Sequence, residues 1–271
     1  VDDGEVLIKS ACVEVGQGFV TLVGQIVEET LGISDITILP VDTSIGSAGS
    51  TSASRQTWMS GGAVLKACEA VVDALLLDLS SENGVAYDKS GLNLVSKDGS
   101  HSIDISAALR GRNYDEHVTH RHKRTFPLDH NGQGNAHVSF AFAAHRAVVD
   151  VDEELGLVRV VEIATSQDVG RVLNPVQARG QIEGGIAQGL GLALLEELVL
   201  NNGKIVNANF TDYLLPTSMD TPPIKIASLI EQSEPGAPFG AKGIGEPPVI
   251  SSTPAIISAV RNATGKKLNR V

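Results

Sequence analysis

One acidic side chain stands in a setting that suits proton transfer. The segment Gly243–Pro248 places a lone carboxylate, Glu246, between glycines and two prolines in an otherwise apolar loop. A carboxylate that is partly removed from water has a raised pKa, which suits a general base, and prolines restrict the backbone that aims it. A solvated loop glutamate is the simpler explanation of these six residues taken alone. This pattern therefore makes Glu246 a candidate base and leaves the simpler interpretation open.

Two glycine-containing loops each precede a predicted helix and could hold a polar or anionic ligand. Gly16-Gln17-Gly18 lies between a predicted strand and a predicted helix, and Gly46–Thr57 offers many hydroxyl groups before a second helix. Backbone N–H groups and the positive end of a helix attract anions at such places. A tight turn and an N-capping loop explain these residues without a ligand, and the second loop lacks the ending of a P-loop.

A third candidate is a glycine-rich stretch of predicted helix. Residues Gly180–Gly191 contain five glycines, and each costs a helix about 1 kcal/mol relative to alanine. Close packing of this helix against a sheet would compensate for that cost. An approach of the helix backbone to a flat cofactor would do so too, with Gln181 and Gln188 as the available hydrogen-bonding side chains.

Histidines and cysteines favour structural roles here. His117, His120 and His122 are spaced like metal ligands, but the arginines and lysine beside them would repel a cation. We therefore expect a polar connector and no metal site made of side chains. Cys12 and Cys68 lie in apolar surroundings and are expected to be small core residues.

The polarity pattern predicts the elements that would carry the first two loops. Alternation over Glu5–Val15 predicts a strand, and apolar residues with a 3.6-residue period predict helices over Phe19–Leu31 and Thr57–Leu79. Ile36–Leu39 is predicted to be a short strand, and Ala86–Lys97 a hairpin. Each glycine-containing loop therefore leads into a helix.

The second half of the chain predicts a different order of elements. Ala136–Asp152 and Leu157–Thr165 predict two long strands joined by a short turn. Val176–Leu200 predicts a long helix, Ile224–Ile230 a further strand, and Pro254–Ala263 a closing helix. Because strands and helices are mixed without a regular βαβ repeat, we expect an α+β fold with two layered subdomains.

A polar connector predicts where the two subdomains divide. Asn113–Gln133 is basic and rich in histidine, which indicates a segment outside both cores. We therefore expect a first subdomain of residues 1–134 and a second of residues 135–271, with the Glu246 loop in the second.

Composition limits the class of protein. The 271 residues can bury a sizeable core, and 21 basic against 32 acidic residues give a formal net charge of −11, which disfavours nucleic acid and anionic membranes as partners. Apolar stretches are too short to span a membrane, and two cysteines fit a reducing compartment, so we expect a cytoplasmic protein. Because the chain opens without methionine and stops without a tail, we expect a fragment or one cleaved piece.

Five segments share their order and spacing with one enzyme family. They are Val13–Gly18, Gly46–Thr57, Asp168–Gly170 with Leu173–Pro175, Gly180–Gly184 with Gln188–Gly191, and Gly243–Pro248. Over nearly its whole length, the chain resembles the second half of the molybdopterin-binding subunit of the molybdenum hydroxylases, the xanthine dehydrogenase and aldehyde oxidase group. The sequence of residues 117–152 is most similar to that of the bacterial xanthine or related purine dehydrogenases.

The resemblance implies roles for individual residues. Glu246 matches the family's catalytic glutamate, the base that takes a proton from a molybdenum-bound hydroxyl so that its oxygen can attack an electron-poor carbon. The implied cofactor-binding positions are Gly16, Gln17, Gly18, Ala53, Ser54, Arg55, Gln56 and Gln181. Among them, Gln181 matches the glutamine that hydrogen-bonds a molybdenum oxo ligand. Arg55 and Gln56 are further donors near the pterin or its phosphate.

The resemblance also implies cofactors and partners. Molybdenum would be held by the dithiolene sulfurs of molybdopterin, with or without an appended cytosine nucleotide, so no side chain has to bind the metal. The first half of the subunit would supply the other wall of the site. Iron–sulfur clusters and FAD on partner domains or subunits would take the electrons away. We therefore expect this chain to be inactive alone.

The expected function is the hydroxylation of xanthine or a related purine with oxygen from water. Two alternatives stay open. The chain could belong to an aldehyde oxidase or a nicotinate-type N-heterocycle hydroxylase. It could also be a non-catalytic module that binds a pterin or a nucleotide through Gly16–Gly18 and Gly46–Ser54, although such a module has no need of a rigid loop that presents one carboxylate.

Overall fold

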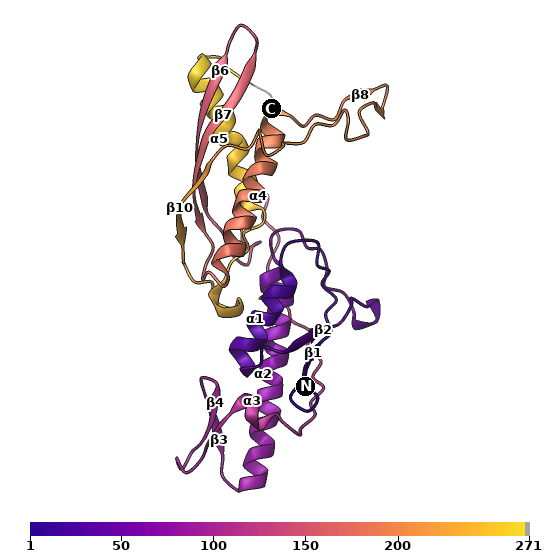
Figure 1. Ribbon diagram of the computed structural model, residues 1–271, viewed down its shortest axis with the longest axis vertical. Coiled ribbons are helices and arrows are strands. Elements are labelled where there is room, and N and C mark those ends of the chain that lie inside the picture. Colours follow the sequence, from indigo (N-terminus) through magenta and orange to yellow (C-terminus); the bar gives the residue numbers. More distant parts are fainter. Residues whose placement is uncertain (269–271) are drawn as a thin grey trace. The chain divides into compact units, whose positions relative to one another are not determined.

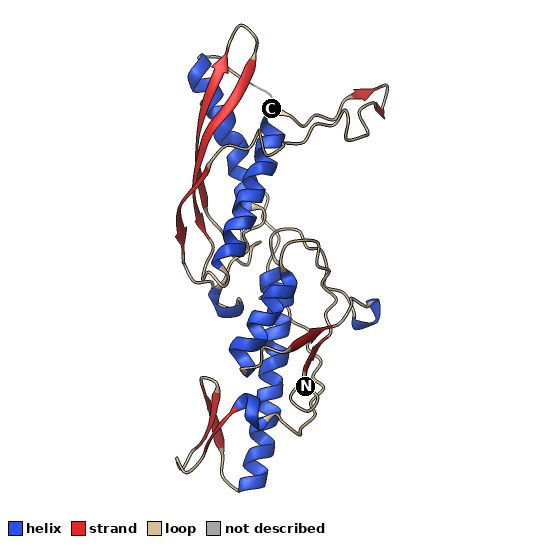
Figure 2. Ribbon diagram, viewed as in Figure 1, coloured by secondary structure: helices blue, strands red, loops and turns tan. Residues whose placement is uncertain are grey.

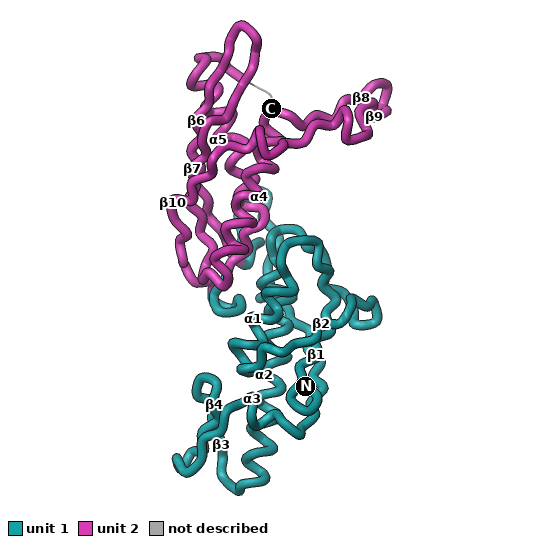
Figure 3. Tube along the Cα trace, in the orientation of Figure 1, with its two compact units in different colours: residues 1–138, 235–241 teal, residues 139–234, 242–271 magenta. Residues whose placement is uncertain are grey.

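Helices and strands build two separate units of this chain. The computed structural model describes residues 1–268, and its mixture of helices and short sheets confirms the expected α+β class (Figures 1 and 2). Unit 1 contains residues 1–138 and 235–241, and unit 2 contains the rest of the chain (Figure 3). The short return to unit 1 has a clear cause, since Phe239 packs against the core of that unit. The subdomain boundary after residue 134 stays a prediction.

Two helices form the centre of unit 1. α1 (Phe19–Leu31) buries the apolar side chains that recur at helical spacing, and it packs against α2 (Gln56–Asn83). Gly32 and Gly84 follow the last turns of these helices with φ of 73° and 67°, a conformation in which only glycine avoids strain. The sequence therefore encodes both the buried faces of these helices and their ends.

Short strands accompany this helix pair. β1 (Val6–Ile8) pairs in parallel with β2 (Ile36–Ile38), and β3 (Tyr87–Ser90), β4 (Asn93–Ser96) and β5 (Ser102–Asp104) form an antiparallel meander. The remaining short elements are η1 (Thr43–Ile45), α3 (Ile105–Ala108) and η2 (Pro238–Gly240) in unit 1, and the hairpin of β8 (Leu200–Asn201) and β9 (Lys204–Ile205) in unit 2.

The predicted strand over Glu5–Val15 is wrong for most of its length. Side chains close to it in sequence take the backbone groups that a longer strand would use for pairing. Ser10 Oγ accepts from the N–H of Cys12 at 3.1 Å, and Gln17 Oε1 accepts from the N–H of Val15 at 2.7 Å. Such local bonds compete with a sheet ladder, and the chain continues to α1 as a loop.

A three-stranded sheet and two helices form unit 2. β6 (Ala143–Asp152) and β7 (Leu157–Asp168) make a long antiparallel hairpin, and β10 (Ile224–Ile230) adds to β7 in parallel. Exposure alternates along the whole of β6, so one face of the sheet turns toward the core. α4 (Pro175–Leu194) and α5 (Pro247–Thr264) lie side by side along the sheet (Figure 1).

Two glycines of α4 explain how closely α4 and α5 approach. A Cβ atom built on Gly185 would lie 2.9 Å from Cβ of Pro248, and one built on Gly189 would lie 2.0 Å from Oγ of Ser252. Larger residues at either position would push α5 away. Close packing is therefore confirmed as the reason for these two glycines, with a helix as the partner where the sequence suggested a sheet.

The limits of both helices differ from the predicted ones. α5 begins seven residues before the predicted start, with Pro247 at its first position and Pro254 in its interior. Pro254 removes one helical hydrogen bond, and the complete burial of Ser252 and Ile256 against neighbouring elements offsets that loss. α4 ends at Leu194, six residues before the predicted end. Within residues 1–268, the helices are too short or too polar to cross a membrane.

The α4 glycines allow a matched stability test. We expect Gly189→Ala to lower the free energy of unfolding by about 1–3 kcal/mol, because its methyl group would overpack the contact with α5. Gly184 lies on the exposed side of α4, where a Cβ would meet no other described residue within 4 Å. Gly184→Ala should therefore raise the free energy by up to about 1 kcal/mol. Urea denaturation measures both values, and equal effects would contradict the packing role.

Candidate functional site

The Gly16–Gly18 turn of unit 1 is organised around a carboxylate of the chain itself. Glu14 accepts hydrogen bonds from the backbone N–H groups of Gly16 at 2.7 Å, Gly18 at 3.1 Å and Val20 at 3.0 Å. Gly16 and Gly18 have φ of 101° and 86°, which a residue with a side chain adopts only with strain. The N–H groups expected to attract an external anion are thus already bound to Glu14.

Gln17 is also occupied within its own turn. Its Nε2 donates to the carbonyl of Val13 at 3.0 Å, and its Oε1 accepts from the N–H of Val15. A ligand that bonds to this amide has to exchange one of these partners. The assignment of Gly16, Gln17 and Gly18 to cofactor binding stays a prediction. Without a ligand, their hydrogen-bonding groups are bound to Glu14, Val13 and Val15.

The second loop ends in two strained residues. Ala53 and Ser54 have φ of 63° and 48°, the left-handed region that costs a residue with a side chain about 1–2 kcal/mol. They stand directly before α2, and Ser54 is half-buried whereas Ala53 is exposed. Backbone strain of this kind clusters at binding and catalytic sites, which is consistent with a ligand-binding role for Ala53 and Ser54.

Arg55 and Gln56 hold the same loop in shape. Arg55 Nε donates to the carbonyl of Ser50 at 2.8 Å, and Gln56 Nε2 approaches that carbonyl at 3.4 Å. A Cβ on Gly49 would lie 2.6 Å from Arg55 Nη2, so the guanidinium lies directly against the loop backbone. The two side chains expected to be donors for the pterin or its phosphate therefore also order the loop in which they lie.

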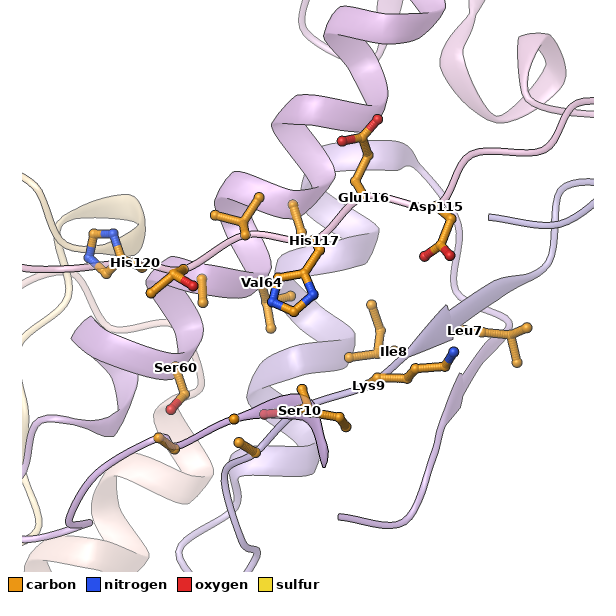
Figure 4. A pocket seen from close by; sticks show the side chains of 18 of the residues that line it. Leu7, Ile8, Lys9, Ser10, Ser60, Val64, Asp115, Glu116, His117 and His120 are labelled. Carbon is orange, nitrogen blue, oxygen red and sulfur yellow. The ribbon is translucent and has the colours of Figure 1, made fainter. Parts of the chain in front are cut away.

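A pocket of about 940 Å³ opens beside this loop within unit 1. Its walls are the end of β1, the loop at Ser44–Ala48, one face of α2 and the connector that follows residue 112. His117 points into it near Val64, and Lys9 lies on the opposite wall (Figure 4). The sequence predicted a solvated connector and missed this wall, because nothing in the local pattern of His117 shows which element it faces.

His120 lines another part of the pocket. Both of its ring nitrogens are buried and have no hydrogen-bond partner in the described part of the chain, and a Cβ on Gly62 would lie 2.7 Å from its Cδ2. Burial, and then the nearby charges of Lys66 and His122, lower the pKa of His120. Among residues 1–268, no group of three or more His, Cys, Asp or Glu side chains could hold a metal ion.

In unit 2, Glu246 occupies the N-cap position of α5 and is half-buried. Ile244, just before it, packs against the apolar core of the unit, and Pro248, just after it, rests on Gly185 of α4. The backbone that carries this carboxylate is therefore held on both sides.

Gln181 lies on α4, the helix that packs against the start of α5. It is half-buried, and it stands one helical turn before Gly185, whose Cβ would lie 3.3 Å from the carbonyl oxygen of Gly245. Gly180 and Gly184 flank Gln181 on the exposed side of α4, and a Cβ on either would meet no other described residue within 4 Å. Packing within unit 2 does not explain these two glycines, so a strip of open backbone adjoins Gln181.

Comparisons with known proteins agree on one kind of domain. A family model described as a molybdopterin cofactor-binding domain matches residues 1–222. The chain is 33% identical to the 6-hydroxypseudooxynicotine dehydrogenase complex subunit gamma of Paenarthrobacter nicotinovorans, over 96% of this chain and 34% of that protein. It is 31% identical to a putative xanthine dehydrogenase molybdenum-binding subunit of Escherichia coli, over 98% of this chain and 36% of that protein.

A solved structure agrees with these sequences. The crystal structure of quinoline 2-oxidoreductase from Pseudomonas putida 86 is similar with a TM-score of 0.78 and 26% identity, over 97% of this chain and 34% of that one. The chain thus spans about a third of the length of the proteins that it matches.

The turn around Glu14 makes stability depend on pH. Partial burial opposes ionisation, but the N–H groups of Val20, Gly18, Gly16 and Phe19 outweigh it and lower the pKa of Glu14 below its ordinary value of 4.5. The ionised carboxylate therefore adds stability above pH 4.5, and this gain is lost as the pH falls through the lower folded-state value.

We therefore expect Glu14→Gln to lower the melting temperature at pH 7, with a difference from the wild type that shrinks on acidification. Thermal denaturation followed from pH 7 down to about pH 3 measures this. A difference that does not change with pH would show that the carboxylate charge has no part in holding the turn.

Proposed function

Because the chain belongs to the molybdopterin cofactor-binding domain family, we propose that it forms the catalytic-base part of a molybdenum hydroxylase. The proposed reaction inserts oxygen from water at an electron-poor carbon of a purine, another N-heterocycle or an aldehyde. The observation that carries this proposal is the placement of Glu246, half-buried at the start of α5 on a backbone held before it by Ile244 and after it by the contact of Pro248 with Gly185.

The residues present fit a cofactor that brings its own metal ligands. Residues 1–268 offer no side-chain cluster for a metal, and unit 2 offers open helix backbone at Gly180 and Gly184 beside the Gln181 amide. These features suit a flat, hydrogen-bonding group. When bound, the molybdenum cofactor would activate the water-derived oxygen and accept the two electrons of the oxidation.

Glu246 would act as the general base of this reaction. Its carboxylate oxygen would take the proton of the attacking hydroxyl and hold it while the substrate is oxidised. Partial burial of this side chain limits competition from bulk water. The amide NH2 group of Gln181 would donate a hydrogen bond to the oxo group or the pterin. This bond would orient the cofactor relative to Glu246.

The proposed substrate follows from the resemblance and from the names of the relatives. Xanthine or a related purine is our first proposal, since residues 117–152 look most like bacterial xanthine dehydrogenases and one relative is named as such a subunit. Another relative acts, by its name, on 6-hydroxypseudooxynicotine, so an N-heterocycle or aldehyde hydroxylase remains the alternative. We also propose a cytoplasmic location.

Further polypeptide segments or subunits would have to complete the enzyme. The relatives are about three times as long as this chain and are named as subunits. We propose that the remaining two thirds of such a subunit supplies the other wall of the site. Iron–sulfur and FAD modules would then receive the electrons, and the cofactor would be molybdopterin with or without a cytosine nucleotide.

Replacing the proposed base separates catalysis from cofactor binding. In the complete enzyme, Glu246→Gln should retain molybdenum and pterin but lower kcat by about 100-fold or more, because it removes the proton acceptor and keeps the shape. Elemental analysis gives the metal content, and dye reduction with xanthine, nicotinate and benzaldehyde as trial substrates gives the rate. The exposed Glu231→Gln serves as the matched control. Normal hydroxylation by metal-loaded Glu246→Gln would exclude Glu246 as the base.

The open strip of α4 gives a second test. Gly184→Ala should lower the molybdenum and pterin content of the purified enzyme, because its methyl group would occupy the surface proposed for the cofactor. The same substitution is expected to stabilise the fold, so a loss of cofactor cannot be attributed to unfolding. Gln181→Ala should lower the rate more mildly. Full cofactor content in Gly184→Ala would remove this face of α4 from the proposed site.

A further inference from the structure

A buried ion pair joins two segments that are 74 residues apart in the chain. Lys242 Nζ lies 2.6 Å from Oδ2 of Asp168, and the two side chains are only 6% and 5% exposed. Asp168 is the last residue of β7, and Lys242 begins the segment that leads to Glu246. The sequence analysis identified Asp168 and the Glu246 loop as parts of two separate segments, and it predicted no contact between them.

Backbone hydrogen bonds surround this pair. The N–H of Lys242 donates to the carbonyl of Val169 at 2.9 Å, and the N–H of Val169 donates to the carbonyl of Ile230 at 3.0 Å. The second carboxylate oxygen of Asp168 accepts from the N–H of Gly170 at 3.2 Å. The chain that enters the Glu246 loop is therefore attached to the ends of both β7 and β10.

Glu246 stands between this attachment and the contact of Pro248 with Gly185. It lies four positions after Lys242, and two of the three intervening residues are glycines, which leave the backbone many conformations. Pro248 fixes the chain after Glu246, and Ile244 packs against the core between the two glycines. An anchor before Gly243 further limits where these glycines can carry the carboxylate.

We propose that the Lys242–Asp168 ion pair positions the Glu246 carboxylate for proton transfer. This role rests on the proposed function of Glu246, and it makes Lys242 and Asp168 positioning residues. A buried charge without its partner is strongly unfavourable, so loss of either side chain would drive the other toward water and move the start of the loop. Displacement of a catalytic group by about 1 Å can lower a rate by about 100-fold.

An ion pair differs from an apolar contact in one respect that matters here. Apolar side chains of similar volume can replace a buried ion pair with little loss of stability. They cannot reproduce its directional bonds between defined atoms. Stability and positioning can therefore be separated by comparing a single with a double substitution.

The test uses the complete, metal-loaded enzyme. Lys242→Met should lower kcat by about 100-fold with a KM change below about threefold and unchanged molybdenum content. Amide hydrogen exchange over residues 243–250, measured without substrate, should become faster. Lys225→Met is the matched control, because it breaks an exposed ion pair with Glu162 on the same sheet and should change neither reading.

The double substitution Asp168→Leu with Lys242→Met decides between positioning and stability. Relative to Lys242→Met, the double variant should have a melting temperature close to that of the wild type, but kcat should stay low and amide exchange over residues 243–250 should stay fast. It also serves as the test if Lys242→Met alone does not fold. Recovery of kcat together with stability, or unchanged exchange in both variants, would overturn the proposal. Normal turnover in Glu246→Gln would instead refute the function of Glu246, while the exchange data would still report whether the pair anchors the loop.

Discussion

The close approach of α4 and α5 depends on two positions that have no side chain, Gly185 and Gly189. Pro248 and Ser252 fill the space that side chains there would need, and this contact fixes the first turn of α5. Glu246 stands directly before that turn, at the N-cap position. The place of the candidate base therefore follows from how closely two helix backbones can pack, and the sheet formed by β10, β7 and β6 supports that helix pair.

Unit 1 shows a different way of holding a loop. Glu14 and Gln17 bind the backbone around the Gly16–Gly18 turn, and Arg55 and Gln56 bind the backbone of the loop before α2. Both loops are thus ordered by their own side chains. A loop that is already ordered loses less conformational entropy when a ligand binds, which favours affinity, although some of its donors must exchange partners.

Local patterns predicted the elements whose ends are set by nearby residues. The helix at Phe19–Leu31 and the strand at Ile224–Ile230 match the structure at both ends, because apolar periodicity and flanking residues define them. The strand over Glu5–Val15 failed because side chains nearby in sequence took its backbone groups. The predicted start of α5 at Pro254 was wrong because packing against α4 offsets the destabilising effect of a proline inside a helix.

The sequence by itself determined the α+β class, the family and the candidate residues, since each of these depends on residue types and their spacing. It could not distinguish Gly185 and Gly189, which meet α5, from Gly180 and Gly184, which remain open. Nor could it show that Asp168 meets Lys242 in the interior. Only the tertiary structure decided these points, because burial and hydrogen-bond partners depend on atoms from segments that are distant in the chain.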